Sequence, residues 1–306
     1  MHIQYKNMTI RNAKERDVSR LVSWWNDGQI MEHAGFPLGL QITEEKVLVQ
    51  IQNDTENHSR LIMEIDDVSI GEMCYTIVKD VAEIGIKICD STKQNKGYGR
   101  IFLSMLIERL FQKGCTKIVL DTMIENIRAQ HVYESLGFNK VGVKIDCWED
   151  QLGNMRSAID YELRKNNFNS YLDDLLIMDI DISDCDCIFH EMEKLVLTYE
   201  DLHTIDIDYV MNWMRKKVSN NMSWYHKVIY NHSIVGYYGI SETELEDLYV
   251  LDGYRNKGFG SQIMNIIQCE ELCVFKKNIG AIAFYERFDF KIKEEMNSRY
   301  IMKKRR

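Results

Sequence analysis

The sequence predicts a mixed α/β fold (α+β around a mixed sheet), built twice in tandem along the chain. Three observations support this prediction. The chain has 306 residues, which is about twice the length of a common domain of roughly 150 residues. A pair of motifs in the first half returns in the same order in the second half. Within each half, segments with the two-residue period of strands alternate with segments that have the 3.6-residue period of helices.

The elements of the first half are predicted from apolar periodicity and from turn and capping residues. Strands are expected at residues 8–11, 61–65, 71–78, 82–89, 117–121, 141–148 and 157–163. Helices are expected at residues 17–25, 43–51, 99–113 and 128–136. Thr43 is the expected N-cap of its helix, residues 35–37 are expected to form a loop, and Asp66 and Asp67 a hairpin turn.

The second half repeats this order in a shorter form. It predicts a strand within residues 175–182, a helix near residues 190–197, a hairpin across Asn231 and His232, a strand at residues 245–250 and a helix at residues 261–268. Polar residues at 164–170 predict a linker near residue 166. We therefore expect two domains, at residues 1–165 and 166–306.

Two separate motifs show the duplication. Gln-Asn-Lys-Gly-Tyr-Gly-Arg at residues 94–100 returns as Arg-Asn-Lys-Gly-Phe-Gly-Ser at residues 255–261. Residues 126–138, with the pattern Asn-x-x-Ala-x-x-x-Tyr, return in the same way at residues 278–290. The interval between the motifs is nine residues shorter in the second copy. A chance match is improbable for two motifs in one order, and we expect the missing residues in the helix that follows the glycine motif.

Composition and charge exclude several classes of protein. The net charge of -9 argues against a nucleic-acid partner, whereas an acidic surface is compatible with a cationic acceptor such as an amine. The sequence has neither a signal peptide nor a membrane-spanning apolar run, so we expect no membrane partner and a cytoplasmic protein. Its eight cysteines are then expected to be reduced thiols, and their spacing does not fit a zinc site, so no metal is expected.

Each glycine motif lies between an alternating strand and a helix. Consecutive backbone N–H groups and the positive end of the helix dipole then point to one place, which favours a phosphate. Gly97, Gly99, Gly258 and Gly260 permit close backbone approach and positive φ angles. The spacing is neither that of a Walker loop nor that of a dinucleotide fingerprint. Nucleoside triphosphates and NAD are therefore not the expected ligands, although such a turn could also bind nothing.

The glycine loop, together with the Asn-x-x-Ala-x-x-x-Tyr-x-x-x-Gly-Phe motif downstream, resembles the GNAT superfamily of N-acetyltransferases over nearly the whole chain. The resemblance implies acetyl-coenzyme A as the acyl donor, with Asn126 and Asn278 at its pantetheine arm. It also implies a splayed strand whose backbone groups, at Ile86, Ile88 and Val250, pair with that arm. The residues implied to hold the pyrophosphate are Gln94, Asn95, Lys96, Gly97, Tyr98, Gly99, Arg100, Arg255, Asn256, Lys257, Gly258, Phe259, Gly260 and Ser261.

The chemistry of acetyl transfer needs an acid and a base. Tyr133 and Tyr285 are the implied acids, because a tyrosine near the sulfur can protonate the departing thiolate, although both could be core aromatics. Glu83 and Glu244 each lie fourteen residues before a loop glycine and are the candidate bases, although a strand glutamate is often merely solvated. The second copy has Asp289 in place of Gly137, so we expect the first copy to be the catalyst.

The acceptor wall is expected between the first two helices, as the resemblance implies. The residues expected there are Trp24, Trp25, Asp27, Glu32 and His33. Aromatics beside carboxylates suit a cation or a sugar face, although either tryptophan could simply pack against the sheet. The tandem arrangement is similar to that of bacterial glucosamine and glucosaminide N-acetyltransferases, which favours an amino sugar.

The expected function is direct acetyl transfer from acetyl-coenzyme A to a primary amine, since no Cys–His pair accompanies either loop. Two alternatives stay open at this point. The acceptor could be a protein N-terminus or a lysine, or the chain could be a non-catalytic sensor that binds acyl-coenzyme A. A two-domain chain can supply its own domain pairing, so a monomer is expected.

Overall fold

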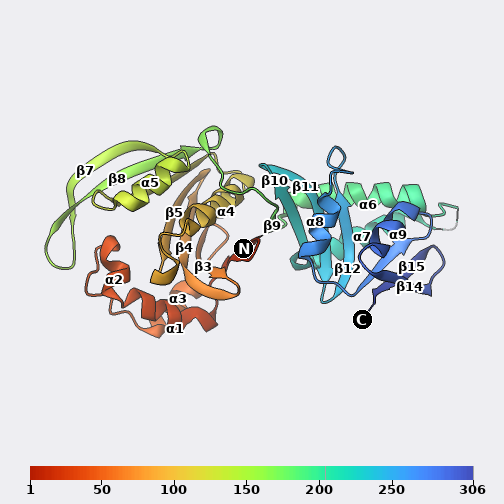
Figure 1. The fold of residues 1–306 in the computed structure, drawn as a ribbon, viewed down its shortest axis with the longest axis horizontal. Helices are drawn as coiled ribbons and strands as arrows, with labels where there is room; N and C mark the ends of the chain where they lie inside the picture. Colours follow the sequence, from red (N-terminus) through yellow and green to blue (C-terminus); the bar gives the residue numbers. More distant parts are fainter. Residues whose placement is uncertain (204, 306) are drawn as a thin grey trace. The chain divides into compact units, whose positions relative to one another are not determined.

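The chain folds into two compact units, Met1–Leu176 and Ile177–Arg306 (Figure 1). The structure is a computed structural model, and it describes residues 1–203 and 205–305. Both units contain a mixed sheet with helices on its two faces. The predicted mixed α/β fold is therefore confirmed, and so is its occurrence in tandem.

The first unit is built on a sheet in the order β1-β2-β3-β4-β5-β6-β8-β7. Its strands are β1 (His2–Tyr5), β2 (Met8–Asn12), β3 (His58–Ile65), β4 (Val68–Val78), β5 (Val81–Ile88), β6 (Lys117–Met123), β7 (Asn139–Glu149) and β8 (Met155–Arg164). Its helices are α1 (Val18–Trp25), α2 (Gly28–Met31), α3 (Glu44–Gln52), α4 (Tyr98–Gln112) and α5 (Ile127–Ser135), with 3-10 turns η1 (Glu15–Asp17), η2 (Glu32–Ala34), η3 (Ser91–Lys93) and η4 (Lys165–Asn167). All neighbouring strands are antiparallel except β5 and β6, which are parallel.

Helices cover both faces of this sheet (Figure 1). Helix α4 packs across β1, β2 and β5, and α5 lies beside α4. On the opposite face, α1 and α3 share a buried apolar cluster with Ile62 of β3, to which Leu21, Trp25 and Val47 contribute. Burial of these side chains stabilises the packing of α1 and α3 on the sheet, since each fully buried large apolar side chain contributes about 1.5–3 kcal/mol.

Local chemistry fixes the ends of these elements. Asp66 and Asp67 join β3 to β4 with φ of 50° and 60°, as a two-residue hairpin turn with two left-handed residues requires. The side chain of Asn126 caps α5 by accepting a hydrogen bond from the Ala129 N–H at 3.2 Å. Thr43 stands at the predicted N-cap of α3. The turn and the positions of both helix starts confirm the sequence prediction.

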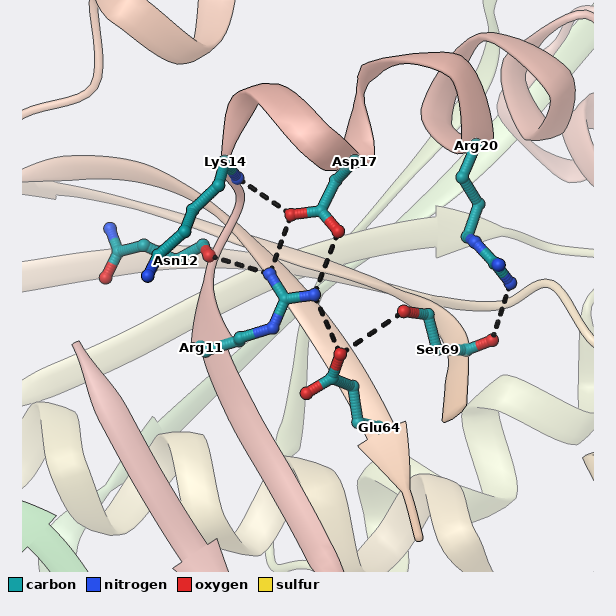
Figure 2. A network of polar contacts seen from close by, with 7 residues as sticks. All are labelled: Arg11, Asn12, Lys14, Asp17, Arg20, Glu64 and Ser69. Atoms are coloured by element: carbon teal, nitrogen blue, oxygen red, sulfur yellow. Dashed lines mark hydrogen bonds and ion pairs between the residues drawn. The ribbon is translucent and has the colours of Figure 1, made fainter. Parts of the chain in front are cut away.

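A buried ion network holds the start of the first helix against the sheet (Figure 2). The guanidinium of Arg11 donates to both carboxylate oxygens of Asp17, at 2.7 and 2.8 Å, and to Glu64 at 2.7 Å. Asp17 also accepts the backbone N–H of Lys14 at 2.8 Å. Arg11, Asp17 and Glu64 are all buried, and together they join β2, η1 and β3 at one point.

The second unit has the sheet order β14-β15-β13-β12-β11-β10-β9. Its strands are β9 (Leu176–Asp179), β10 (Tyr225–Tyr230), β11 (Ser233–Ser241), β12 (Glu244–Val250), β13 (Glu271–Phe275), β14 (Phe290–Glu295) and β15 (Arg299–Lys304). Its helices are α6 (Cys185–Tyr199), α7 (Ile207–Asn220), α8 (Phe259–Ile266) and α9 (Ile279–Glu286), with η5 (Ile182–Asp184) and η6 (Met222–Trp224). The turn at Asn231 and His232, with φ of 46° and 62°, is the predicted hairpin.

The shorter second copy lost residues from one helix and one strand. Helix α8 has eight residues where α4 has fifteen, and β13 has five where β6 has seven. These differences account for the nine missing residues, so most of the deletion lies in the helix, as predicted. Periodicity did not indicate β1 or α7, and α6 begins at Cys185, before the expected start at residue 190.

The segment that follows the last strand of the first unit packs on that unit. Tyr171 N–H bonds to Ser104 Oγ at 3.1 Å, and Asn169 N–H bonds to the Leu136 carbonyl at 3.0 Å. Phe168 lies beside Phe111, with ring centroids 5.9 Å apart. The division into compact units thus falls after Leu176, whereas the boundary between acetyltransferase-type domains at residues 165 and 166 stays a prediction.

Candidate functional site

The site begins where two parallel strands separate. Strands β5 and β6 pair only at Val81–Lys117, Ala82–Ile118 and Glu83–Val119. Beyond Glu83 the strands diverge, so the β6-facing backbone groups of residues 84–88 have no partner on β6. Backbone N–H and C=O groups without a strand partner can pair with an extended ligand as a further strand would. The structure therefore has the splayed strand that the family resemblance implied.

The glycine loop closes one end of this splay. Gly97 is the N-cap of α4 with φ 82°, and Asn95 has φ 59°. A Cβ at Gly97 would meet nothing within 4 Å, and the start of the fifteen-residue helix lines the cleft at Gly97, Tyr98 and Gly99. Gln94 anchors the loop by donating its side-chain N–H to the Ile88 carbonyl at 2.9 Å. This geometry suits an anion at the start of α4.

A cleft of about 1400 Å³ runs through the first unit from this loop to the other face of the sheet. The implied donor-binding residues of the first unit line it, with the exception of Lys96, which is exposed. The lining residues from the donor prediction are Ile86, Ile88, Gln94, Asn95, Gly97, Tyr98, Gly99, Arg100 and Asn126. The cleft exceeds the roughly 300–1,000 Å³ of a pocket for a drug-sized ligand, so it has room for an extended donor and a second substrate.

Tyr133 lies in this cleft on α5. Its side chain is 8% exposed and packs against Phe138 and Tyr161, with centroid distances of 5.9 and 5.7 Å. Burial, and to a smaller extent the charge of Asp121, raises the pKa of Tyr133 to about 12. The phenol therefore keeps its proton at neutral pH and can donate a hydrogen bond.

Two carboxylates lie on the face of the sheet opposite α4. Glu83 pairs in register with Val119, and Asp121 follows two residues later on β6, so their side chains share one face. Both line the cleft and are exposed. Sequence analysis did not single out Asp121, although its place on the second splayed strand could have indicated it.

A third carboxylate in the cleft, Glu72, is already fully engaged. It accepts hydrogen bonds from Trp25 Nε1 at 2.7 Å, from Arg60 at 2.9 Å and from Lys87 at 3.2 Å. Its side chain is 3% exposed. Because these three donors occupy it, Glu72 serves as an anchor that joins α1, β3 and β5 behind the acceptor side of the cleft.

Most of the predicted acceptor wall is structural. Trp25 is 3% exposed and belongs to the core, and Arg20 lies over the ring of Trp24 at 5.9 Å. Asp27 caps α2 by accepting the Gln29 N–H at 2.8 Å, and Glu32 is exposed on η2. Of these residues, His33 lines the cleft. The expectation that Trp24, Trp25, Asp27 and Glu32 face the acceptor is thus not supported by their positions.

The long hairpin of β7 and β8 reaches the loop after α2 (Figure 1). At its tip, the Gln151 N–H bonds to the Gly35 carbonyl at 3.0 Å. The Gln151 side chain accepts the Leu38 N–H and donates to the Gly39 carbonyl, both at 2.9 Å. Trp148, which lines the cleft, packs so closely on Gly35 that a Cβ there would lie 2.2 Å from the indole ring.

The second unit keeps the donor-side architecture. Strands β12 and β13 pair only at Glu244–Glu271 and Leu245–Leu272, and Gly258 caps α8 with φ 88°. Asn278 caps α9 through the Ala281 N–H at 3.0 Å, and Arg255 donates to the Val250 carbonyl at 2.9 Å, as Gln94 does to Ile88. Phe284, however, lies 3.3 Å from a Cβ position at Gly260, close to the loop that would meet the phosphates.

The other predicted loop residues of the second unit are divided between core and surface. Phe259 is buried against Tyr230, and Lys257 lies over the ring of Tyr254 at 5.6 Å. Asn256 has φ 61°, the same left-handed conformation as Asn95, and Ser261 follows in the first turn of α8. Tyr285 packs beside Phe290 with a centroid distance of 6.2 Å, and burial raises its pKa.

The acceptor face of the second unit is filled by its own side chains. Asp247 stands three residues before Val250, as Gly85 stands three residues before Ile88. The Asp247 carboxylate accepts hydrogen bonds from the hydroxyl groups of Tyr225 and Tyr249. Lys217 of α7 reaches Glu246 at 2.6 Å and Asp247 at 3.5 Å. Tyr225 and Tyr249 belong to the core cluster beneath α6 and α7, so this face holds a packed polar network.

Glu244 is the counterpart of Glu83 in the sheet register. It pairs with Glu271, seven residues before Asn278, as Glu83 pairs with Val119, seven residues before Asn126. A register shift between Gly239 and Ile240 leaves Glu246 as an extra residue without a partner on β11. Burial first, and then Glu246 and Glu271, raise the pKa of Glu244.

The splayed strand pair, the glycine turn at a helix start and the buried phenol beside it define an acyltransferase of the mixed α/β type. Known proteins agree with this class. The "Acetyltransferase (GNAT) family" matches residues 30–138, and a second "Acetyltransferase (GNAT) domain" matches residues 223–292.

Relatives with established names are similar to parts of the chain. A [Ribosomal protein bS18]-alanine N-acetyltransferase of Salmonella typhimurium is 30% identical over 35% of this chain and 72% of its own length. N-alpha-acetyltransferase 30 of Dictyostelium discoideum is 33% identical over 19% of this chain, which spans 31% of that relative's length. A spermidine N-acetyltransferase from Vibrio cholerae, solved with CoA and spermine, covers 53% of this chain and 97% of its own, with 20% identity and a TM-score of 0.48.

The chain therefore belongs to the GNAT family of acetyltransferases and carries two domains of that family in tandem. Enzymes of this family use acetyl-coenzyme A as their donor. Within residues 1–203 and 205–305, no helix is both long and apolar enough to cross a membrane.

Proposed function

We propose that the first unit transfers the acetyl group of acetyl-coenzyme A to a primary amine by direct attack of the amine nitrogen. The observation that carries this proposal is one cleft lined both by the glycine loop with Tyr133 and by the face that holds Glu83 and Asp121. Donor and acceptor can then meet inside a single unit. The amino sugar glucosamine is our proposed acceptor, and a protein N-terminus, as in the names of two relatives, is the alternative.

The donor would be held by the residues of the splay and the loop. Residues 94–100 would bind the pyrophosphate through N–H groups at the start of α4 and through Arg100. The backbone of Ile86 and Ile88 would pair with the pantetheine arm. Asn126 uses its side-chain oxygen to cap α5, so its amide nitrogen is the group left for the arm. When bound, acetyl-coenzyme A supplies an activated thioester to this face.

The amine must lose a proton in order to attack, and Glu83 is the proposed base. Asp121 is a second carboxylate on the same face and the alternative base. Glu72 is excluded because it is buried and accepts three hydrogen bonds. The carboxylate takes one proton from the protonated amine before the attack. As the carbon–nitrogen bond forms and the carbon–sulfur bond breaks, the nitrogen releases a second proton, which balances the proton given to the departing sulfur.

Tyr133 is the proposed acid, and its raised pKa limits how it can act. A phenol with a pKa of about 12 is less acidic than a thiol at about 8.5, a difference that corresponds to roughly 5 kcal/mol. Complete transfer to the thiolate is therefore unfavourable by itself. We propose that the phenol donates a hydrogen bond, and the proton, only as charge develops on the departing sulfur.

The second unit is proposed to bind donor without transferring the acetyl group. Its acceptor face is occupied by Lys217, Asp247 and two tyrosines, so an amine has no room to approach there. This is the specific observation that favours a sensor role, confined to residues 177–306.

The test is release of coenzyme A thiol from acetyl-coenzyme A with glucosamine, measured against a blank without acceptor. Tyr133→Phe should lose turnover and keep its affinity for the donor, whereas Tyr285→Phe should change neither. No thiol release with any amine would favour the sensor for the whole chain. Loss of turnover in Tyr285→Phe alone would assign the chemistry to the second unit. A cytoplasmic monomer remains our expectation, to be checked by light scattering and fractionation.

A further inference from the structure

The segment at residues 168–175, which follows η4, is fastened to the first unit near both of its ends. We call it the connecting segment. Near its start, the Asn169 N–H bonds to the Leu136 carbonyl at 3.0 Å, at the end of α5. Near its end, Asp173 accepts a hydrogen bond from Lys6 Nζ at 2.8 Å, on the turn between β1 and β2. Tyr171 lies between these two points, so its place is set by the fold of the first unit.

Tyr171 contacts both helices that carry implied donor-binding residues. Its backbone N–H bonds to Oγ of Ser104 at 3.1 Å, and Ser104 is fully buried on α4. Its side chain meets Ser135, the last residue of α5, and Arg100. Hydrogen bonding with Ser135 first, and then with Arg100, lowers the pKa of Tyr171. Tyr171 therefore connects the segment to α4 and α5 together.

The ring of Tyr171 lies against the cation at the start of α4. The guanidinium carbon of Arg100 is 5.2 Å from the ring centre, within the roughly 6 Å of a cation–π contact. Arg100 is in the first turn of α4 and lines the cleft. Ser104 follows four residues later, so both side chains lie on one face of the helix. This is the face of α4 that Tyr171 contacts.

A cation at this position needs a reason, because a positive charge in the first turn opposes the helix dipole. A bound phosphate removes that conflict. Arginine also has a long side chain, which loses rotamer freedom when it holds an anion. A guanidinium that stacks on an aromatic ring loses part of that freedom beforehand and keeps in-plane N–H groups for phosphate oxygens. The second copy of the motif has Ser261 in place of Arg100, so this pair belongs to the first unit.

We propose that Tyr171 is a positioning residue for donor binding, whose ring orients Arg100 toward the pyrophosphate of acetyl-coenzyme A. This inference rests on the proposed binding of the donor at residues 94–100. Tyr171 lies outside both duplicated motifs. The connecting segment, which leads to the second unit, thus contributes to the donor affinity of the first unit.

The experiment measures Kd for coenzyme A at the first unit of the full chain, from protection of residues 98–101 against hydrogen exchange. Arg100→Ala should raise this Kd about tenfold, because it removes charge-assisted bonds. Tyr171→Ala should raise it about three- to fivefold, whereas Tyr171→Phe keeps the ring and should stay within about twofold of wild type. Tyr209→Ala is the matched control and should leave Kd unchanged, because this tyrosine is 70% exposed in the second unit.

A double variant separates positioning from a purely structural role. If Tyr171 acts through Arg100, Tyr171→Ala should have no further effect on Kd in the Arg100→Ala background. Effects that multiply instead would mean that Tyr171 only holds α4 and α5 together, and would overturn the inference. So would a Kd for Tyr171→Ala equal to that of Tyr209→Ala. Tyr171→Leu fills the space without a π face, and should give the same rise in Kd even if Tyr171→Ala does not fold.

Failure of the transferase proposal is visible separately, because the readout is binding. Absence of thiol release with any amine would refute acetyl transfer, while the dissociation constants would still decide the role of Tyr171. A wild-type protein that coenzyme A does not protect at residues 98–101 would refute the donor site itself, and the inference with it.

Discussion

The buried network of Figure 2 makes a quantitative prediction about stability. Arg11→Met removes the cation that two buried carboxylates, Asp17 and Glu64, share at 2.7–2.8 Å. Removal of one partner from a buried ion pair costs about 3–5 kcal/mol, because the remaining charge stays buried and unpaired. For a unit of this size, each kcal/mol lowers Tm by roughly 2–4 °C. We therefore expect Tm of the first unit to fall by roughly 6–20 °C.

The pH dependence of this loss has a definite sign. In the wild type, burial opposes ionisation of Asp17, but the bonds from Arg11 and Lys14 outweigh it and lower its pKa. That stabilisation is present above the unfolded pKa of about 3.9 and is lost as the pH falls through the lower folded value. The difference in Tm between wild type and Arg11→Met should thus shrink as the pH falls below about 4.

The assay is thermal unfolding followed by circular dichroism, with hydrogen exchange of β2 and β3 amides to assign the loss to the first unit. Arg11→Met combined with Asp17→Asn should be more stable than Arg11→Met alone, since one buried charge is gone. A Tm within 2 °C of wild type for Arg11→Met would refute the reasoning, because the network would then be solvated rather than buried.

Three further predictions concern the cleft. Tyr133→Phe should lower kcat by roughly 10²–10⁴-fold with an unchanged Kd for coenzyme A. In the wild type the rate should not fall up to pH 10 through loss of this acid, since a pKa of about 12 keeps the phenol protonated; a wild-type rate that falls between pH 8 and 10 would contradict this. Gly97→Val should weaken donor binding by at least tenfold in calorimetry, because a side chain would enter the space at the start of α4, whereas Gly114→Val, also at positive φ with open space, should not. The tip of the β7–β8 hairpin, at residues 148–154, should keep its conformation on acidification to about pH 4, because the stabilisation by Asp150 is lost only as the pH falls from about 3.9 through its folded pKa of about 2; faster hydrogen exchange at Leu152 at pH 5 would argue against it.

Local sequence signals predicted much of the donor side. Gly97 and Gly258 require positive φ, and Asn126 and Asn278 cap their helices within three residues, so each motif contains its own structural cause. The same holds for the hairpin turn at Asp66 and Asp67. The interactions that fix these turns and helix caps lie within a short stretch of chain. The glycine and asparagine motifs also occur twice in the sequence, which made them easier to recognise.

The acceptor side depends on contacts that sequence spacing does not reveal. Gln151 lies 112 residues from Gly39, and Glu72 meets Trp25 across 47 residues. Asp27 was expected to face the acceptor, but its carboxylate caps the N-terminus of α2. Each failure arose where tertiary packing decided the use of a residue.

The separation of β5 and β6 after Glu83 leaves the first unit with an unfinished sheet in its interior. A donor arm that pairs there becomes, in effect, a missing strand, and its affinity is then part of the folding free energy. Donor at a hundred times its Kd would add about 2.7 kcal/mol of stability. The lifetime of this protein against proteolysis would thus rise and fall with the acetyl supply of the cell, even when no acceptor is being modified.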